Sequence, residues 1–223
     1  MKRFKKSVFR EYFESIIVAV VLALFIRTWV VQAFKIPTGS MENSLLIGDH
    51  LLVNKFIFSP TLSRFENSIL PVGQIRRGDV AVFKYPADPE RDFIKRVIGL
   101  PGETVEVNAK NVYIDGRKLD EAYTSYFNLG QGDVRKPYGP VVIPAKHYFV
   151  MGDNRDNSQD SRYWGFLPEG YFRGRALMVY WSYESNRQDY IASGLGSGVK
   201  RVLSISVNFF SLTRWERLFH QIH

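Results

Sequence analysis

The 223-residue chain has no cysteine and only four histidines, so several kinds of active site are missing from it. Without cysteine there is no disulfide, no thiol nucleophile and no cysteine-ligated metal. The histidines are scattered, and none stands in a GxSxG or HExxH motif: they are His50, His147, His220 and His223. A catalytic base other than histidine is therefore the simpler expectation.

The chain also lacks a basic patch, although its net charge is +8. Five of these charges lie in residues 1–10, which contain no acid, so 8 − 5 leaves +3 for the rest of the chain. That remainder is close to neutral and shows no strip of basic and aromatic residues of the kind that binds RNA or DNA. We therefore expect no nucleic-acid partner.

No hydrophobic run is long enough to cross a bilayer without interruption. The run from Ile16 to Ile26 has eleven residues, and at ~1.5 Å per residue it falls short of a ~30 Å hydrocarbon core. Extended to Tyr12–Phe34 it has 23 residues, with Glu14 and Arg27 placed near the two interfaces. This predicts one transmembrane helix, with residues 1–34 as basic cytosolic tail and anchor and the rest outside the cytosol.

A cleavable secretory signal is the alternative interpretation of the same segment. A basic start, an apolar centre and small residues at the ends of Val31-Gln32-Ala33 fit that pattern. A cut after Ala33, by the chain itself or by another enzyme, would free the remaining domain from the membrane. We favour the anchor, because Phe34-Lys35-Ile36-Pro37 leads directly into the candidate site described below.

Residues 35–192 are predicted to form a mainly antiparallel β domain. Runs rich in valine, isoleucine and aromatic residues, broken by glycine and proline, predict strands over 50–55, 79–85, 93–98 and 176–181. A hairpin with a two-residue turn is expected at Asp115-Gly116, within an inserted lobe at about 104–146.

Residues 193–223 are predicted as a glycine-serine joint and an amphipathic tail. Apolar residues fall on one helical face of the tail, with Arg214 and Arg217 turned away. We favour packing of this tail on its own domain over contact with a membrane. The apolar residues are Leu212, Trp215, Leu218, Phe219 and Ile222.

Two residues in separate segments offer a nucleophile and a base. Ser40 follows Pro37-Thr38-Gly39, although a serine in such a turn is more often a helix cap. Lys95 alternates with Phe93 and Val97 in a predicted strand, so its amine is expected to lie against apolar side chains. A lysine base near neutral pH needs a pKa about 2–3 pH units below the usual 10.4. The alternative for Lys95 is a lysine at a sheet edge with its amine in solvent.

The acid-rich segment 153–162 does not match a calcium-binding loop. If the loop began at Asp156, Ser161 would replace the required glycine and Leu167 the closing glutamate. We therefore expect no metal and no cofactor.

Together these segments resemble the type I signal peptidases (leader peptidases) of bacteria. The resemblance covers the anchor and about 35–183, and it rests on five segments in the family's order: Ile36–Met41, Gly48–Lys55, Gly78–Phe83, Asp92–Glu103 and Gly152–Pro168. It implies a membrane-bound serine endopeptidase of the bacterial inner membrane that cleaves signal peptides from exported preproteins after small residues at −1 and −3. Preproteins and the lipid bilayer are the partners it implies.

Carried over residue by residue, the resemblance implies Ser40 as nucleophile and Lys95 as general base. It implies that Ser158 orients the lysine amine by a hydrogen bond, and that the Ser40 N–H and the Thr38 hydroxyl form an oxyanion hole. Threonine stands at 38 where serine is also common in the family, so a methyl group must fit beside the oxyanion.

The resemblance further implies that Asp160 and Arg162 stabilise the loop that carries Ser158, linked with Arg96. Arg96 cannot act as a base because its pKa is too high, so a structural role is expected. Two rivals remain: a non-enzymatic peptide-binding β domain, which needs no buried lysine, and a self-cleaving Ser/Lys regulator, which is expected to carry a DNA-binding module.

Overall fold

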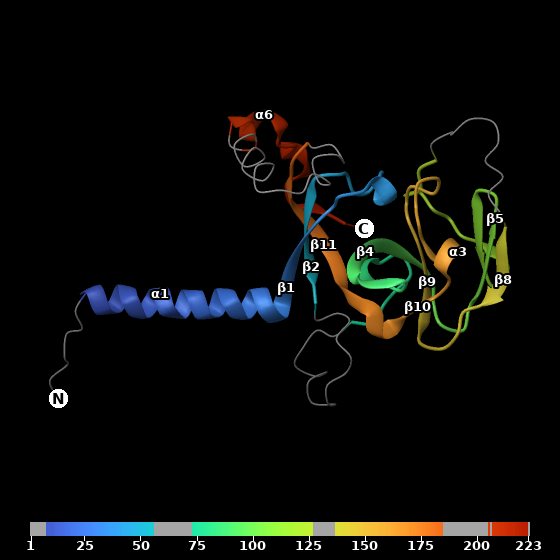
Figure 1. Cartoon of the computed structure of the whole chain (residues 1–223), viewed down its shortest axis with the longest axis horizontal. Coiled ribbons are helices and arrows are strands. Elements are labelled where there is room, and N and C mark those ends of the chain that lie inside the picture. Colours follow the sequence, from blue (N-terminus) through green and yellow to red (C-terminus); the bar gives the residue numbers. More distant parts are fainter. Residues whose placement is uncertain (1–7, 56–72, 127–136, 185–204, 206, 223) are drawn as a thin grey trace.

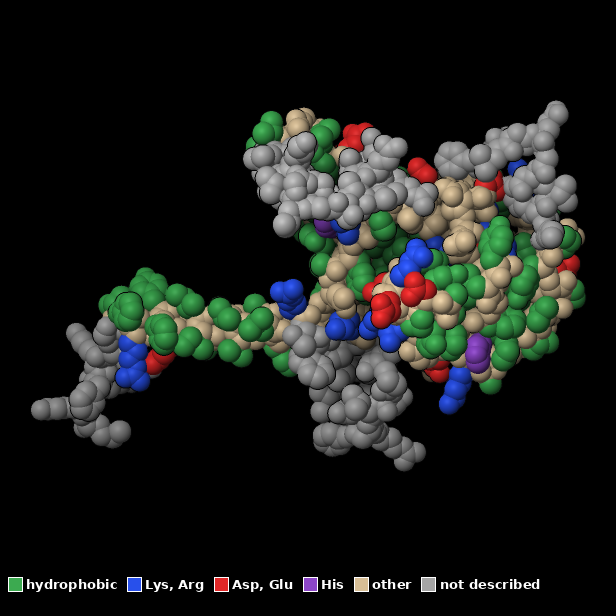
Figure 2. All heavy atoms as spheres, viewed as in Figure 1, with side chains coloured by type: hydrophobic (Ala, Val, Ile, Leu, Met, Phe, Trp, Pro, Cys, Tyr) green, Lys and Arg blue, Asp and Glu red, His purple; other side chains and the backbone are tan. Residues whose placement is uncertain are grey.

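The described part of the chain begins with a helix that stands away from the body of the protein (Figure 1). The computed structural model describes residues 8–55, 73–126, 137–184, 205 and 207–222. Helix α1 (Val8–Phe25) buries none of its residues, and hydrophobic side chains cover its surface (Figure 2). A π-helical turn, Ile26–Val30, leads from α1 into strand β1 (Val31–Lys35). Among the described residues, no helix combines the length and apolarity needed to cross a membrane.

The predicted span over Tyr12–Phe34 is therefore wrong at its C-terminal end. Residues 31–35 form a strand, because β1 pairs with β2 (Asp49–Asn54) from Val31 opposite Asn54 to Lys35 opposite His50. Ala33, the residue before the alternative signal cut, lies within this ladder opposite Leu52.

The main sheet has eight antiparallel strands in the order β1-β2-β11-β3-β4-β9-β10, with β12 paired to β11. All four strands predicted from the sequence are present, so the mainly β, antiparallel fold is confirmed. The further strands of this sheet are β3 (Val80–Tyr85), β4 (Asp88–Gly99), β9 (His147–Met151), β10 (Leu167–Pro168), β11 (Phe172–Ser182) and β12 (His220–Gln221).

The centre of this sheet is buried on both faces, which explains the unbroken apolar run of β3. Val80 and Val82 belong to one hydrophobic cluster and Ala81 and Phe83 to another. A strand covered on both sides has apolar residues at every position, whereas β2 alternates buried and half-buried residues. The site described below lies at the edge of the first cluster, which includes Met41.

A second sheet of four strands, in the order β7-β6-β5-β8, lies within the predicted lobe range. Its hairpin turn has φ of 51° at Asp115 and 74° at Gly116, which confirms the predicted two-residue turn. Ile98 and Phe149 of the main sheet share a hydrophobic cluster with this lobe, so one core joins them. The strands are β5 (Thr104–Asn108), β6 (Asn111–Ile114), β7 (Arg117–Lys118) and β8 (Tyr138–Val142).

The described part of the tail does not form the expected continuous amphipathic helix. It consists of α6 (Phe209–Leu212), a 3-10 turn (Trp215–Arg217) and β12. The two arginines predicted to turn away contact the domain instead: Arg214 donates to the Ile47 carbonyl, and Arg217 pairs with the buried Asp49 at 2.6 Å. Packing on the domain is confirmed, but strand pairing and these contacts replace the helix. The predicted glycine-serine joint lies outside the described residues.

Candidate functional site

Ser40 lies in a buried 3-10 turn, Gly39–Met41. The Met41 and Leu45 side chains are fully buried, and the Leu45 N–H donates to the Met41 carbonyl at 2.8 Å, so the turn is fixed to the core. The N-cap of the turn is Thr38, whose side chain makes no capping hydrogen bond. The helix-cap interpretation of Ser40 is therefore wrong, because the serine lies inside the turn.

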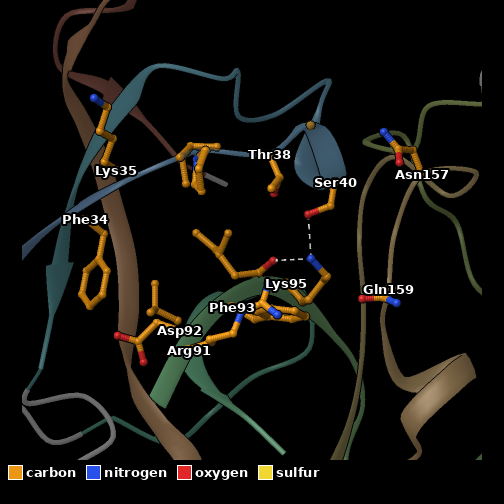
Figure 3. A pocket seen from close by; sticks show the side chains of 15 residues that line it. Phe34, Lys35, Thr38, Ser40, Arg91, Asp92, Phe93, Lys95, Asn157 and Gln159 are labelled. Carbon is orange, nitrogen blue, oxygen red and sulfur yellow. Dashed lines mark hydrogen bonds between the residues drawn. The ribbon is translucent and has the colours of Figure 1, made fainter. Parts of the chain in front are cut away.

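Lys95 reaches Ser40 from the neighbouring strand β4. Its Nζ lies 2.6 Å from Ser40 Oγ and donates to the Ile94 carbonyl at 2.9 Å (Figure 3). The side chain is 3% exposed, and Nζ lies 5.4 Å from the centre of the Phe93 ring. Phe93 and Val97 belong to one hydrophobic cluster, as the alternation in the sequence predicted. The solvent-exposed edge lysine is excluded.

Burial is the main reason why the pKa of the Lys95 amine is lower than usual. Desolvation lowers the pKa of Lys95 from 10.5 to about 8, with a smaller lowering from Arg162 and an opposite effect of Asp160 and Asp153. With this pKa, about half of the amine is neutral at pH 8. A neutral amine has a lone pair that can accept the Ser40 proton.

Arg96, on the opposite face of β4, forms a buried ion pair with Asp153. Its Nε donates to Asp153 Oδ1 at 2.8 Å and its Nη2 to Oδ2 at 2.7 Å, and both side chains are at most 2% exposed. Ser44 Oγ donates to the same carboxylate at 2.6 Å, and Arg96 also donates to the Gly78 carbonyl. This network ties the strand of Lys95 to the residues after Ser40 and to the loop after β9.

The ion pair between Asp160 and Arg162 is present as expected. Arg162 Nε donates to Asp160 Oδ1 and Nη2 to Oδ2, each at 2.8 Å, and Nη2 also donates to the Arg155 carbonyl. Asp160 Oδ2 accepts the Gly152 N–H at 3.0 Å. The carboxylate partner of Arg96 is, however, Asp153, to which the sequence analysis gave no role. Because a buried arginine requires a carboxylate partner, the sequence could indicate that Arg96 pairs with an aspartate. It could not indicate which aspartate.

The expected hydrogen bond from Ser158 to Lys95 is not formed. Ser158 is buried, and its Oγ has no hydrogen-bond partner in the described part of the chain. Lys95 Nζ donates one hydrogen bond to the Ile94 carbonyl instead. Ser158 instead packs closely on Gly152: a Cβ atom at Gly152 would lie 2.3 Å from Ser158 Oγ and 2.4 Å from the Ser40 carbonyl oxygen.

Gly152→Ala should therefore displace Ser40 and Ser158. We expect kcat/KM to fall at least tenfold, with a loss of about 1–3 kcal/mol in the free energy of unfolding from overpacking. Gly170→Ala is a matched control, because its Cβ would meet no atom within 4 Å. Kinetics and thermal unfolding of both variants test this. A Gly152→Ala enzyme with wild-type kcat would show that the close contact does not position Ser40.

Asn154, another residue that sequence analysis missed, holds the peptide groups of the serine turn. Its Nδ2 donates to the Gly39 carbonyl at 3.1 Å and its backbone N–H to the Ser40 carbonyl at 3.2 Å. In a trans peptide the C=O of Gly39 and the N–H of Ser40 point in opposite directions, so this N–H is directed away from Asn154. The first N–H groups of a helical turn have no partner within the turn, which leaves this donor available to an oxyanion.

Ser40 and Lys95 open into a cavity of about 620 Å³. Thr38 and Ser40 project into it from the same side (Figure 3). The chain before Ser40 and the first half of β4 form most of its wall, and two amide residues complete it. Its lining is Phe34, Lys35, Ile36, Pro37, Thr38, Gly39, Ser40, Val82, Arg91, Asp92, Phe93, Ile94, Lys95, Asn157 and Gln159.

Comparison with known proteins finds the same family from several sources. A family model described as signal peptidase, peptidase S26, matches residues 9–181. Signal peptidase I of Pseudomonas aeruginosa is 38% identical over 80% of this chain and 75% of its own length. Signal peptidase I of Aquifex aeolicus is 33% identical over 78% of this chain and 84% of its own length. A crystal structure of a signal peptidase I from Enterococcus faecalis aligns with a TM-score of 0.39, covering 46% of this chain and 96% of that one at 32% identity.

Proposed function

The chain belongs to the signal peptidase family, peptidase S26, and from this premise we propose that it cleaves signal peptides with Ser40 as nucleophile and Lys95 as general base. Cleavage of signal peptides by a serine peptidase follows from the family. The assignment of the two residues depends on one observation, the 2.6 Å contact between Lys95 Nζ and Ser40 Oγ in a buried site.

In the proposed acylation step, neutral Lys95 accepts the Ser40 proton while Oγ attacks the carbonyl carbon of the scissile bond. The negative charge that develops on the carbonyl oxygen is stabilised by the Ser40 N–H and the Thr38 hydroxyl. The protonated lysine then gives its proton to the leaving amine, which is the new N-terminus of the mature protein. Lys95 next activates a water molecule, which hydrolyses the acyl-enzyme and restores Ser40.

Ser158 has a place in this cycle although it makes no hydrogen bond in the resting site. When Lys95 becomes an ammonium it has three N–H donors, one more than the neutral amine. The buried Ser158 Oγ has no hydrogen-bond partner in the described part of the chain, and this free acceptor supports the orienting role implied by the family.

The pH profile should reveal the lysine directly. Protonated Lys95 has no lone pair, so kcat/KM for a peptide substrate should rise with pH through an apparent pKa of about 8. Lys84→Ala is a suitable control, because Lys84 lies on the neighbouring strand outside the cavity lining and should not move this midpoint. An acid limb that continues to rise to pH 10 would assign the base to an ordinary lysine or to another group.

The substrate is proposed to bind as an added strand in the cavity between β1 and β4. Among the described strands, β1 pairs only with β2, and β9 pairs with β4 only from Arg96 to Gly99. The edges around Lys35 and around Arg91–Lys95 therefore face the cavity with backbone groups available to an extended peptide.

If the substrate binds as an added strand, the enzyme should require small residues only at alternate substrate positions. Side chains at −1 and −3 point to the enzyme wall, which includes Ile36, Val82 and Ile94, whereas −2 points away. Replacing alanine by leucine at −1 should lower kcat/KM at least a hundredfold, and the same change at −2 less than tenfold. Matched peptides that differ only at these positions provide the measurement. Equal losses at −1 and −2 would contradict strand addition.

Membrane attachment is proposed to occur through α1 and the residues around it. The apolar side chains of α1 are exposed, and the five basic residues in 1–10 favour a cytosolic N-terminus, with the catalytic domain outside the cytosol. The helical part ends at Val30, which shortens the anchor relative to the sequence prediction. Resistance to alkaline extraction from membranes tests the attachment, and full release by this treatment would contradict it.

A further inference from the structure

Two neutral amides, Asn157 and Gln159, form the wall of the cavity on the far side of the catalytic pair. Figure 3 shows them across the Ser40–Lys95 pair from Phe34. Both are exposed, whereas Ser158 between them and Asp160 after them are buried. Both amide residues therefore contribute to the cavity lining, while their neighbours Ser158 and Asp160 point into the protein.

The segment that carries these amides is held in place by its buried residues. Asp160 is bound to Arg162 and to the Gly152 N–H, and the Asn157 N–H contacts Asn154 Oδ1 at 3.3 Å. Neither the Asn157 nor the Gln159 side chain has a hydrogen-bond partner in the described part of the protein. Their backbone is thus positioned by the structure, while their amide groups remain available to a ligand.

The position of α1 indicates which part of a substrate passes this wall. Helix α1 leads through the turn Ile26–Val30 into β1, which carries Phe34 of the cavity lining, and β9 lies farther from α1 than β1 does (Figure 1). This step depends on the proposed function: the signal sequence, whose apolar part is near the membrane, approaches from the α1 side. The residues after the scissile bond then leave along Asn157 and Gln159.

We propose that Asn157 and Gln159 bind the backbone of the first mature residues, about +1 to +3, of the substrate. Both amides line the cavity beyond the Ser40–Lys95 pair, so a substrate that leaves the site on this side passes them. Each amide side chain has both donor and acceptor atoms, so it can pair with a backbone N–H or C=O whatever the side chain. The site thus holds the mature segment without selecting its sequence.

The test compares two peptide substrates that have the same residues before the scissile bond. One peptide extends to +5, and the other ends as an amide at +1. For the Asn157→Ala/Gln159→Ala enzyme, the loss of kcat/KM on the long peptide should exceed the loss on the short one by about tenfold, as expected for two lost hydrogen bonds. Arg91→Ala, at the other end of the cavity, is the matched control and should change both peptides by the same factor.

Each outcome separates this proposal from the proposed function. An equal loss on both peptides, or no loss on either, would overturn mature-side binding while the wild-type enzyme remained a signal peptidase. Failure of the wild type to cleave either peptide would overturn both. Thermal unfolding of the double variant excludes misfolding, and Gln159→Ala alone should show a smaller excess loss on the long peptide in the same direction.

Discussion

Replacing Lys95 by methionine should lower kcat by about 10⁴-fold or more, and Ser40→Ala should do the same. Each change removes one half of the proposed catalytic pair, whose amine and hydroxyl lie 2.6 Å apart. The double variant should be no slower than either single variant, because the remaining partner alone contributes little. Lys95→Arg should also be inactive, since a guanidinium does not give up its proton near neutral pH. Single-turnover kinetics of the four variants measure this.

Thermal unfolding provides the control for Lys95→Met. The amine has a lower pKa in the folded protein, about 8 against 10.5, so the unfolded chain binds its proton more tightly. The free energy of unfolding is therefore reduced by this group below about pH 8, and the reduction disappears as the pH rises through 10.5. A methionine has no such penalty, so the variant should melt no lower than wild type at pH 7. A folded Lys95→Met enzyme with a tenth of wild-type kcat would refute the assignment of the base.

Thr38→Val should lower kcat by about 10²–10³-fold, the usual effect of deleting one oxyanion donor. Valine keeps the shape of threonine but cannot donate a hydrogen bond to the developing charge. Thr38→Ser keeps the hydroxyl and should retain most activity. The alternative role of Thr38 as a cap is not available, because its side chain makes no capping hydrogen bond.

The two Thr38 variants are compared by kcat and by melting temperature. The oxyanion role is supported if Thr38→Val loses kcat at an unchanged melting temperature and Thr38→Ser keeps near wild-type activity. A well-folded valine variant within threefold of wild type would show that Thr38 only packs beside Ser40.

Local patterns were sufficient to predict four of the eight strands of the main sheet. The run Val80–Phe83 indicates a buried strand by composition alone, and Asp115-Gly116 has residues suited to positive φ. The alternation around Lys95 also predicted its apolar surroundings and the direction of its pKa change. The burial of Lys95 beside Ser40 favours the enzyme over the rival non-enzymatic β domain, which has no use for a buried lysine.

The end of the anchor was not predictable, because it depends on a distant partner. Val30, Val31 and Phe34 suit an apolar helix and a strand equally well. Strand pairing with His50–Asn54 decides the conformation, and that contact is not visible in the local sequence. The tail was misjudged for the same reason, since β12 forms only by pairing with β11.

The sequence could predict that ion pairs form near the site, but not which residues are paired. Segment 152–162 contains three aspartates, Asp153, Asp156 and Asp160, and any of these carboxylates could have faced Arg96. The choice depends on which side of the loop after β9 each carboxylate occupies. Likewise, the contacts of Asn154 with Gly39 and Ser40 join residues more than a hundred positions apart.

The most direct test of Ser40 as the nucleophile of a signal peptidase is cut-site mapping on a preprotein. The detergent-solubilised full chain is incubated at pH 8 with a preprotein that has alanine at −1 and −3, and the products are identified by mass spectrometry. We expect a single cut after the −1 alanine, and no cut by Ser40→Ala under the same conditions. The absence of cleavage by the wild type, or the same cut by Ser40→Ala, would contradict the proposed function.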